Sequence, residues 1–283
     1  MAGAPAAAGA QVEAGAAAEV SVGEAASAGL AEAVLAVAER AEAGKKRMTF
    51  DKDLNQLVER LTRACGDNLV SVVLHGSAAS DDFHPEFSDV NTLAVVNELG
   101  LSAMQAISSV VVWWTGLKYP PPLFFTSREL HAVADVYAIE MLDIKARHRI
   151  LHGKDVVQNL EVPMALHRVQ LEHEIRTKLL LLRQHYMGSA KDEARIRHLM
   201  LDSVSSFLAL FRHTLIAMGE APPHHKRDVA ARIAARLGFD PLPLEQLLQV
   251  REHTLRAEEL NVDQVFTGYV RAIEQVAQAV DAL

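Results

Sequence analysis

The sequence predicts an α+β fold, with a small mixed-sheet domain followed by a C-terminal helical bundle and preceded by a disordered N-terminal tail. Three observations predict it. Strand and helix signals alternate over residues 47–155, the apolar period is helical over residues 156–283, and residues 1–46 are mostly Ala, Gly, Glu and Ser. The length of 283 residues also suits two domains of modest size.

The tail, residues 1–46, offers few large apolar side chains that could be buried in a core. Because Ala and Glu favour helices, residues 29–43 are expected to form at most a transient helix. The basic residues around Lys45 are better explained as a solvated linker than as an address signal.

The elements of residues 47–155 follow one another with short connections. A helix begins near Thr49 or Asp51 and ends at Gly66, since glycine interrupts helices. The expected elements after it are strands at 69–75, 90–96 and 123–125, helices at 102–114 and from 127, and a fourth strand at 136–144.

Beyond Arg147 the strand signals stop and long amphipathic segments begin. Helices are expected at 163–187, 191–218, 226–237, 243–257 and 262–280, separated by Gly and Pro residues. These segments predict a helical bundle without internal repeats.

Composition narrows the function. A net charge of −8 disfavours binding to long nucleic acid, which usually requires a basic stripe, but it allows a nucleotide substrate accompanied by a metal ion. Cys65 is the single cysteine, which is typical of a reduced, cytoplasmic protein. No apolar run of about 20 residues is present, so no membrane span is expected.

Two short segments carry the chemical signal, Leu74–Ser77 and Ser88–Asn91. Gly76 lets the backbone approach a phosphate, and Ser77 offers a hydroxyl and a backbone N–H to it. Asp89 and Asn91 are two residues apart on an expected strand, so their oxygens share a face and could hold Mg²⁺.

These segments resemble the hallmark of the nucleotidyltransferase superfamily, which includes DNA polymerase beta and the aminoglycoside adenylyltransferases. The hallmark is an apolar strand, Gly-Ser, a spacer, and Ser-Asp-x-Asp. The helical half, notably residues 171–178, is similar to the C-terminal domain of some bacterial members.

The resemblance implies that Mg²⁺ assists the transfer of a nucleoside monophosphate from ATP or another nucleoside triphosphate to the hydroxyl of an unidentified acceptor, a small molecule or a protein. It implies that Gly76, Ser77 and Ser88 bind the nucleotide and that Asp89 is catalytic and a metal ligand together with Asn91. It also implies a third carboxylate on a later strand, for which Glu140 is the first choice as catalytic residue and metal ligand, and Asp143 the second.

Two residues depart from the family pattern. Asn91 replaces the second aspartate, which removes one negative charge from the metal site, and Ser80 replaces a glycine of the loop. Two functions therefore stay open: a metal-dependent nucleotidyltransferase, and a degenerate relative that senses a nucleotide or binds a partner. A third alternative is a helical scaffold that forms a homodimer.

Several other residues allow two interpretations. The first is that a basic residue of the long helix clamps a phosphate (Arg176, Lys178 or Arg183). The second, which we favour, is that Arg176 and Lys178 form i,i+4 ion pairs with Glu172 and Glu174 on a solvated face. The acidic residues of the loop assist metal capture or form a solvated rim (Asp81, Asp82 and Glu86). His75 reaches the nucleotide or points between sheet and helix.

Overall fold

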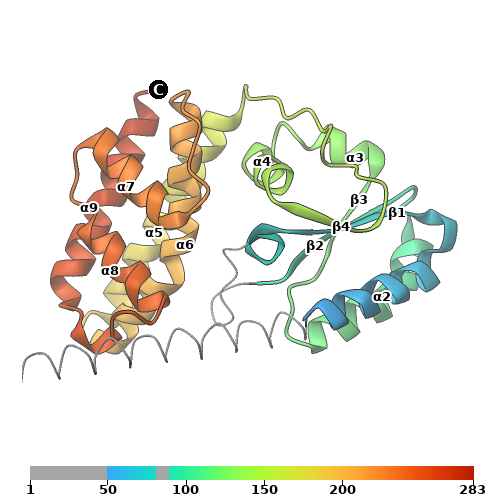
Figure 1. Cartoon of the computed structure of the whole chain (residues 1–283), viewed down its shortest axis with the longest axis horizontal. Helices are drawn as coiled ribbons and strands as arrows, with labels where there is room; N and C mark the ends of the chain where they lie inside the picture. Colours follow the sequence, from blue (N-terminus) through green and yellow to red (C-terminus); the bar gives the residue numbers. More distant parts are fainter. Residues whose placement is uncertain (1–49, 81–88) are drawn as a thin grey trace, which may run out of the picture. The chain divides into compact units, whose positions relative to one another are not determined.

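The computed structural model describes residues 50–80 and 89–283, in which a four-stranded sheet is followed by a helical bundle (Figure 1). This arrangement confirms the predicted α+β class. The predicted tail, residues 1–46, lies outside the described residues. The limits of the two predicted domains, 47–155 and 156–283, stay predictions.

The sheet is mixed, with the strand order β3-β2-β1-β4. β1 is antiparallel to both β2 and β4, and β2 is parallel to β3. The strands are β1 (Leu69–His75), β2 (Asn91–Val96), β3 (Leu123–Thr126) and β4 (His148–Gly153). His75 lies opposite both Asn91 and His148, so the end of β1 meets the starts of β2 and β4.

Helices cover both faces of the sheet (Figure 1). The helix of residues 50–65 and α2 (Leu101–Gly116) pack on one face, in a core that includes Val72 and Leu74. α3 (Ser127–Ala132) and α4 (Ala138–Ala146) pack on the other face, in a core that includes Val73. Because successive strand residues point to opposite faces, His75 shares the face of Val73, which supports its position between sheet and helix.

The fourth strand was predicted in the wrong place. Residues 138–146 form the helix α4, and β4 begins just after it, in the segment where strand signals were expected to have ended. The buried residues of α4 include Ala138, Met141 and Ile144, a spacing of three that is helical. A short apolar run does not distinguish a buried strand from a helix, and here the packing on the sheet decides.

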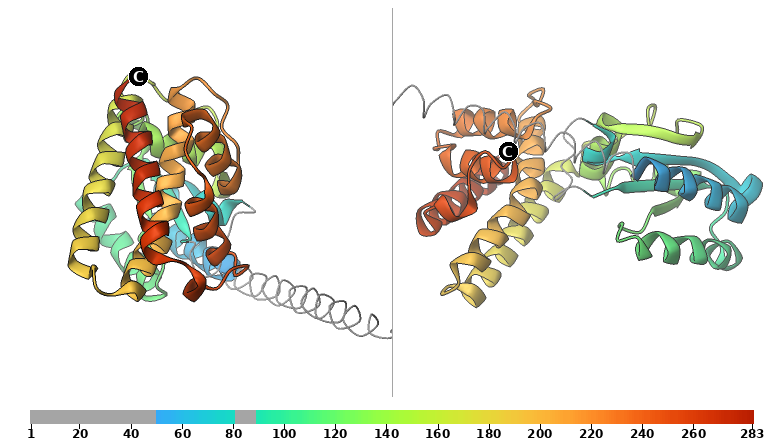
Figure 2. Two further views of the ribbon diagram at one scale, coloured as in Figure 1. Left: turned by 90° about the vertical axis from the view of Figure 1, so that its left-hand side faces the viewer. Right: turned by 60° about the horizontal axis from the view of Figure 1, so that its bottom comes forward.

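The bundle has five long helices in the described part of the chain, each at a predicted place, although α5 begins later and α8 ends earlier than expected. They are α5 (His167–Ser189), α6 (Glu193–Ala217), α7 (Lys226–Leu237), α8 (Leu242–Arg251) and α9 (Val262–Asp281). α6 contacts the other four, and Figure 2 shows it beside α5 and α9. α6 is also long and apolar enough to cross a membrane by length and composition, but its buried apolar residues form the centre of the bundle core.

α4 contributes to two cores. Its residue Ile139 belongs to the core of the bundle, whereas Met141 and Ile144 belong to the core between α4 and the sheet. α4 therefore connects the sheet to α5 and α6 through side-chain packing.

Candidate functional site

The Gly-Ser turn follows directly on β1. Gly76 has a φ of +76°, a left-handed conformation that favours glycine, and residues Gly76–Ala79 form a short 3₁₀ helix. Both the backbone N and the Oγ of Ser80 donate to the carbonyl oxygen of Ser77, at 3.1 and 3.2 Å. The φ of Ser80 is −133°, so this backbone does not require the glycine that the family pattern has there.

Asn91 lies against this turn. It is the first residue of β2 and pairs with His75. A Cβ built on Gly76 would lie 3.6 Å from the Nδ2 of Asn91 and would meet no other atom of the described residues within 4 Å, its chain neighbours aside. The residue at the place of the second motif aspartate is therefore adjacent to the Gly-Ser turn, as the motif predicts, but it is a neutral amide.

Asp89 precedes β2 by two residues and is exposed. It is not part of the strand, so the argument that it shares a strand face with Asn91 does not apply. Ser88, the third residue predicted to bind the nucleotide, lies outside the described residues, as do the acidic loop residues Asp81, Asp82 and Glu86.

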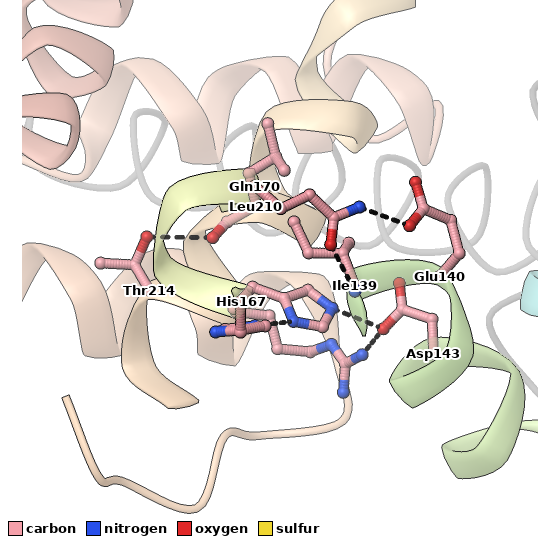
Figure 3. A network of polar contacts seen from close by, with 9 residues as sticks. Ile139, Glu140, Asp143, His167, Gln170, Leu210 and Thr214 are labelled. Carbon is pink, nitrogen blue, oxygen red and sulfur yellow. Dashed lines mark hydrogen bonds and ion pairs between the residues drawn. The ribbon is translucent and has the colours of Figure 1, made fainter. Parts of the chain in front are cut away.

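Glu140 lies on α4 and not on a strand, so the reason for choosing it as third carboxylate was wrong. Its Oε2 accepts a hydrogen bond of 2.7 Å from Nε2 of Gln170 on α5. The Oε1 of the same amide accepts from the backbone N of Ile139 at 3.1 Å, so Gln170 caps the first turn of α4 (Figure 3). The catalytic and metal-binding roles of Glu140 remain predictions.

Asp143, the second choice, faces the bundle from α4 (Figure 3). Its Oδ1 accepts a hydrogen bond of 2.9 Å from Nε2 of His213 and forms an ion pair with Arg212, both on α6. Both partners contact the same oxygen, so Oδ1 is already engaged by an N–H donor and a guanidinium of α6.

The described residues do not supply the ligand set that the family's metal would need. Near the Gly-Ser turn they offer the carboxylate of Asp89 and the amide of Asn91, and the two later acids face α5 and α6. Across residues 50–80 and 89–283, no three His, Cys, Asp or Glu side chains are grouped so that they could hold a metal ion.

His75 is a partly buried base beside the turn, and its Nε2 is fully buried. Its Nε2 has no hydrogen-bond partner among the described residues. Burial lowers the pKa of His75 to about 4, so the ring is neutral at pH 7. A neutral imidazole between sheet and helix adds no positive charge to the site.

Basic residues of α5 form surface ion pairs, and those of Arg176 and Lys178 are the i,i+4 pairs favoured from the sequence. Arg176 pairs with Glu172 at 2.8 Å, Lys178 pairs with Glu174 at 3.8 Å, and Arg183 reaches Glu274 of α9 at 2.6 Å. The sequence reasoning missed Arg212 and His213. The sequence signal that could have identified them is that Arg212 and His213 interrupt the otherwise apolar stripe of α6.

The fold therefore combines a mixed sheet, a Gly-Ser turn after its central strand β1 and a C-terminal helical region, which is the architecture that the resemblance to nucleotidyltransferases implied. Among solved structures, the chain is similar to the spectinomycin adenyltransferase AAD(9) from Enterococcus faecialis, solved with ATP and spectinomycin. The sequences are 14% identical, the TM-score is 0.49, and the match covers 79% of this chain and 99% of the other. No protein-family model matches the chain, and no curated protein does.

Proposed function

We propose that this chain is a nucleotide-binding protein of nucleotidyltransferase type that has lost metal-dependent transfer. In this proposal the turn at Gly76 and Ser77 holds the phosphates of a nucleoside triphosphate such as ATP. One observation carries the proposal: the amide of Asn91 lies against Gly76, at the position where the resemblance expects a metal-binding carboxylate.

The shape of the turn supports phosphate binding. Among the described residues other than its chain neighbours, only Asn91 lies within 4 Å of the position that a Cβ of Gly76 would take, so these residues leave room for a phosphate beside the turn. The N–H of Gly76 itself donates to the carbonyl oxygen of Arg147, so it is not a donor to that phosphate. The Ser77 hydroxyl forms no hydrogen bond with another described residue, so it is available as a donor. The amide of Asn91 can donate to a phosphate oxygen as well, which a carboxylate cannot do.

The positions of the acids support the loss of transfer. Asn91 brings no charge, and the carboxylates of Glu140 and Asp143 are engaged by side chains of α5 and α6. Asp89 is thus the one acid of the predicted set that belongs to the motif itself, and it is exposed.

Calorimetric titration of the full chain with ATP, with and without Mg²⁺, tests the proposal. We expect binding in both conditions and a loss of about tenfold in affinity in Ser77→Ala, because a hydrogen bond to a charged group is worth about 1.5–3 kcal/mol. Ser108→Ala is the matched control, since Ser108 lies on α2 and its Oγ donates to the backbone of its own helix. Absence of binding to ATP and GTP would contradict the proposal.

A second candidate function is the metal-dependent transfer itself, from ATP or another nucleoside triphosphate to an acceptor hydroxyl of a small molecule or a protein. The exposed Asp89, two residues before Asn91, favours it. Pyrophosphate release that is lost in Asp89→Ala would establish this second function, whereas binding unchanged in Asp89→Ala without pyrophosphate release supports the first.

A further inference from the structure

A chain of buried polar contacts joins α4 to the bundle. His213 and His167 are 0% and 1% exposed, and Arg212 is 6% exposed. Nε2 of His167 lies 3.0 Å from Nδ1 of His213, and Nε2 of His213 lies 2.9 Å from Oδ1 of Asp143. Arg212 also contacts Oδ1 of Asp143. Figure 3 labels His167 and Asp143, between which these contacts run. We call these four residues the α4–α6 cluster.

The direction of the hydrogen bonds follows from the acceptor at the end. Asp143 as a carboxylate accepts only, so Nε2 of His213 carries the proton. Burial, together with the charge of Arg212, lowers the pKa of His213 to about 3, so the ring is neutral and its Nδ1 is an acceptor. Nε2 of His167 must therefore donate to it. Each of these hydrogen bonds has one donor and one acceptor. The positive charge of Arg212 balances the negative charge of the Asp143 carboxylate.

The backbone continues from the cluster to the Gly-Ser turn. The N–H of Arg147, at the end of α4, donates to the carbonyl oxygen of Asp143 at 3.1 Å. The N–H of Gly76 donates to the carbonyl oxygen of Arg147 at 3.2 Å. β4 starts at the next residue, His148, which pairs with His75. Two backbone hydrogen bonds thus separate Asp143 from Gly76.

We propose that Arg212 and His213 are positioning residues of the nucleotide site, through which α6 holds the last turn of α4 and, by the Arg147 carbonyl, the conformation of the Gly-Ser turn. This inference rests on the proposed function for its ligand. In it, Asp143 is the anchor of α4 and not a metal ligand.

The geometry favours positioning over general stabilisation. The bundle core holds α4 through Ile139 and the sheet core holds it through Met141 and Ile144, but apolar packing is non-directional and does not alone fix the exact rotation of this nine-residue helix about its axis. A hydrogen bond and an ion pair to one carboxylate, with Gln170 capping the opposite end, fix that rotation. The rotation of α4 in turn sets where the Arg147 carbonyl points.

The test uses two readouts on the full chain: ATP affinity by calorimetry, and hydrogen exchange of the peptide over residues 72–80 by mass spectrometry. We expect His213→Leu to weaken ATP binding about tenfold and to raise exchange at Gly76 and Ser77, but not in β2. His213→Gln, whose Nε2 can still donate to Asp143, should stay within threefold of the parent affinity. Asp143→Asn, which keeps an acceptor but removes the charge, should fall between the two.

Met200→Ala is the matched control, because Met200 is fully buried in the bundle core and is not in the cluster. It should lower the melting temperature while ATP affinity and exchange at the turn stay unchanged. Equal effects of Met200→Ala and His213→Leu on both readouts, or no effect of His213→Leu on either, would overturn the inference. If the parent chain does not bind ATP but His213→Leu still raises exchange at Gly76, the proposed function fails and the positioning role stands.

Discussion

Asn91 distinguishes the two proposed functions by a single atom, because a carboxylate oxygen would replace its Nδ2 beside Gly76. In Asn91→Asp we expect ATP binding to become dependent on Mg²⁺, since two carboxylates bind a hard cation more tightly than one carboxylate and an amide. Without Mg²⁺ the affinity should fall, because the new charge repels the triphosphate. Calorimetry with and without Mg²⁺ measures both effects.

The control for this change is Asn91→Leu, which removes the amide without adding charge. It should weaken binding equally in both conditions. An Asn91→Asp variant that is folded and binds ATP like the parent in both conditions would show that residue 91 does not face the phosphates.

Gly76 predicts a stability effect that does not depend on any ligand. Its φ of +76° costs a residue with a Cβ about 1–2 kcal/mol, although the space around it is open. We expect Gly76→Ala to lower the free energy of unfolding by this amount in urea titrations. Gly188→Ala in α5, where φ is not positive and no atom is close, should raise it by about 0.5–1 kcal/mol. Equal effects of the two substitutions would contradict the assignment of the turn.

At the scale of elements, the sequence predicted most of the sheet because the signals are local. β1 is a continuous apolar run that ends at Gly76, and the proline run before β3 forces an extended chain. α4 was not predictable in this way, since its apolar residues fit a strand as well as a helix. The helix is selected by contacts with the sheet core and by its cap, Gln170, which is about 30 residues away in the sequence.

The two tryptophans of α2 have different environments. Trp114 is fully buried, stacks on Tyr119 at 4.3 Å between ring centroids, and donates from Nε1 to the carbonyl oxygen of Pro120 at 2.8 Å. Trp113 is half-buried under the guanidinium of Arg60, 4.2 Å from the ring centroid.

Trp114→Ala should therefore lower the free energy of unfolding by about 3–5 kcal/mol, because it leaves a cavity and an unpaired carbonyl oxygen. Trp113→Ala removes a partly solvated cation–π contact and should cost about 1 kcal/mol. Chemical denaturation of both variants checks the order, and a larger loss in Trp113→Ala would contradict the packing of α2.

At the scale of the whole molecule, the sequence predicted a sheet region followed by a bundle but not how α4 connects them. The Gly-Ser turn and the position of Asn91 beside it were predicted because strand ends and turns depend on residues that are close in the sequence. The pairing of Asp143 with Arg212 and His213 spans about 70 residues, and no local pattern specifies such a contact. The same pairing engages Asp143, which was the second choice for the third carboxylate of the motif.

This buried cluster also predicts how the stability of the molecule depends on pH. Burial and the charge of Arg212 lower the pKa of His213 to about 3, against a weaker opposing effect of Glu140 and a further lowering by Arg147. Burial and His213 lower the pKa of His167 to about 4. Both rings are therefore neutral in the folded chain and bind protons only after unfolding, at an ordinary pKa near 6.5.

Because the unfolded chain binds more protons below pH 6.5, the free energy of unfolding is highest above that pH and falls as the pH drops from about 6.5 towards 4. Each of the two histidines contributes a slope of up to about 1.4 kcal/mol per pH unit in this window. Urea titrations of the double variant His167→Gln/His213→Gln should show a shallower slope than the parent, whatever its stability at pH 7. Met200→Ala, which removes no titratable group from the bundle core, should lower the stability and leave the slope unchanged. If the double variant keeps the slope of the parent, the two rings are not both neutral in the folded chain, and the direction assigned to the hydrogen bond between His167 and His213 is wrong.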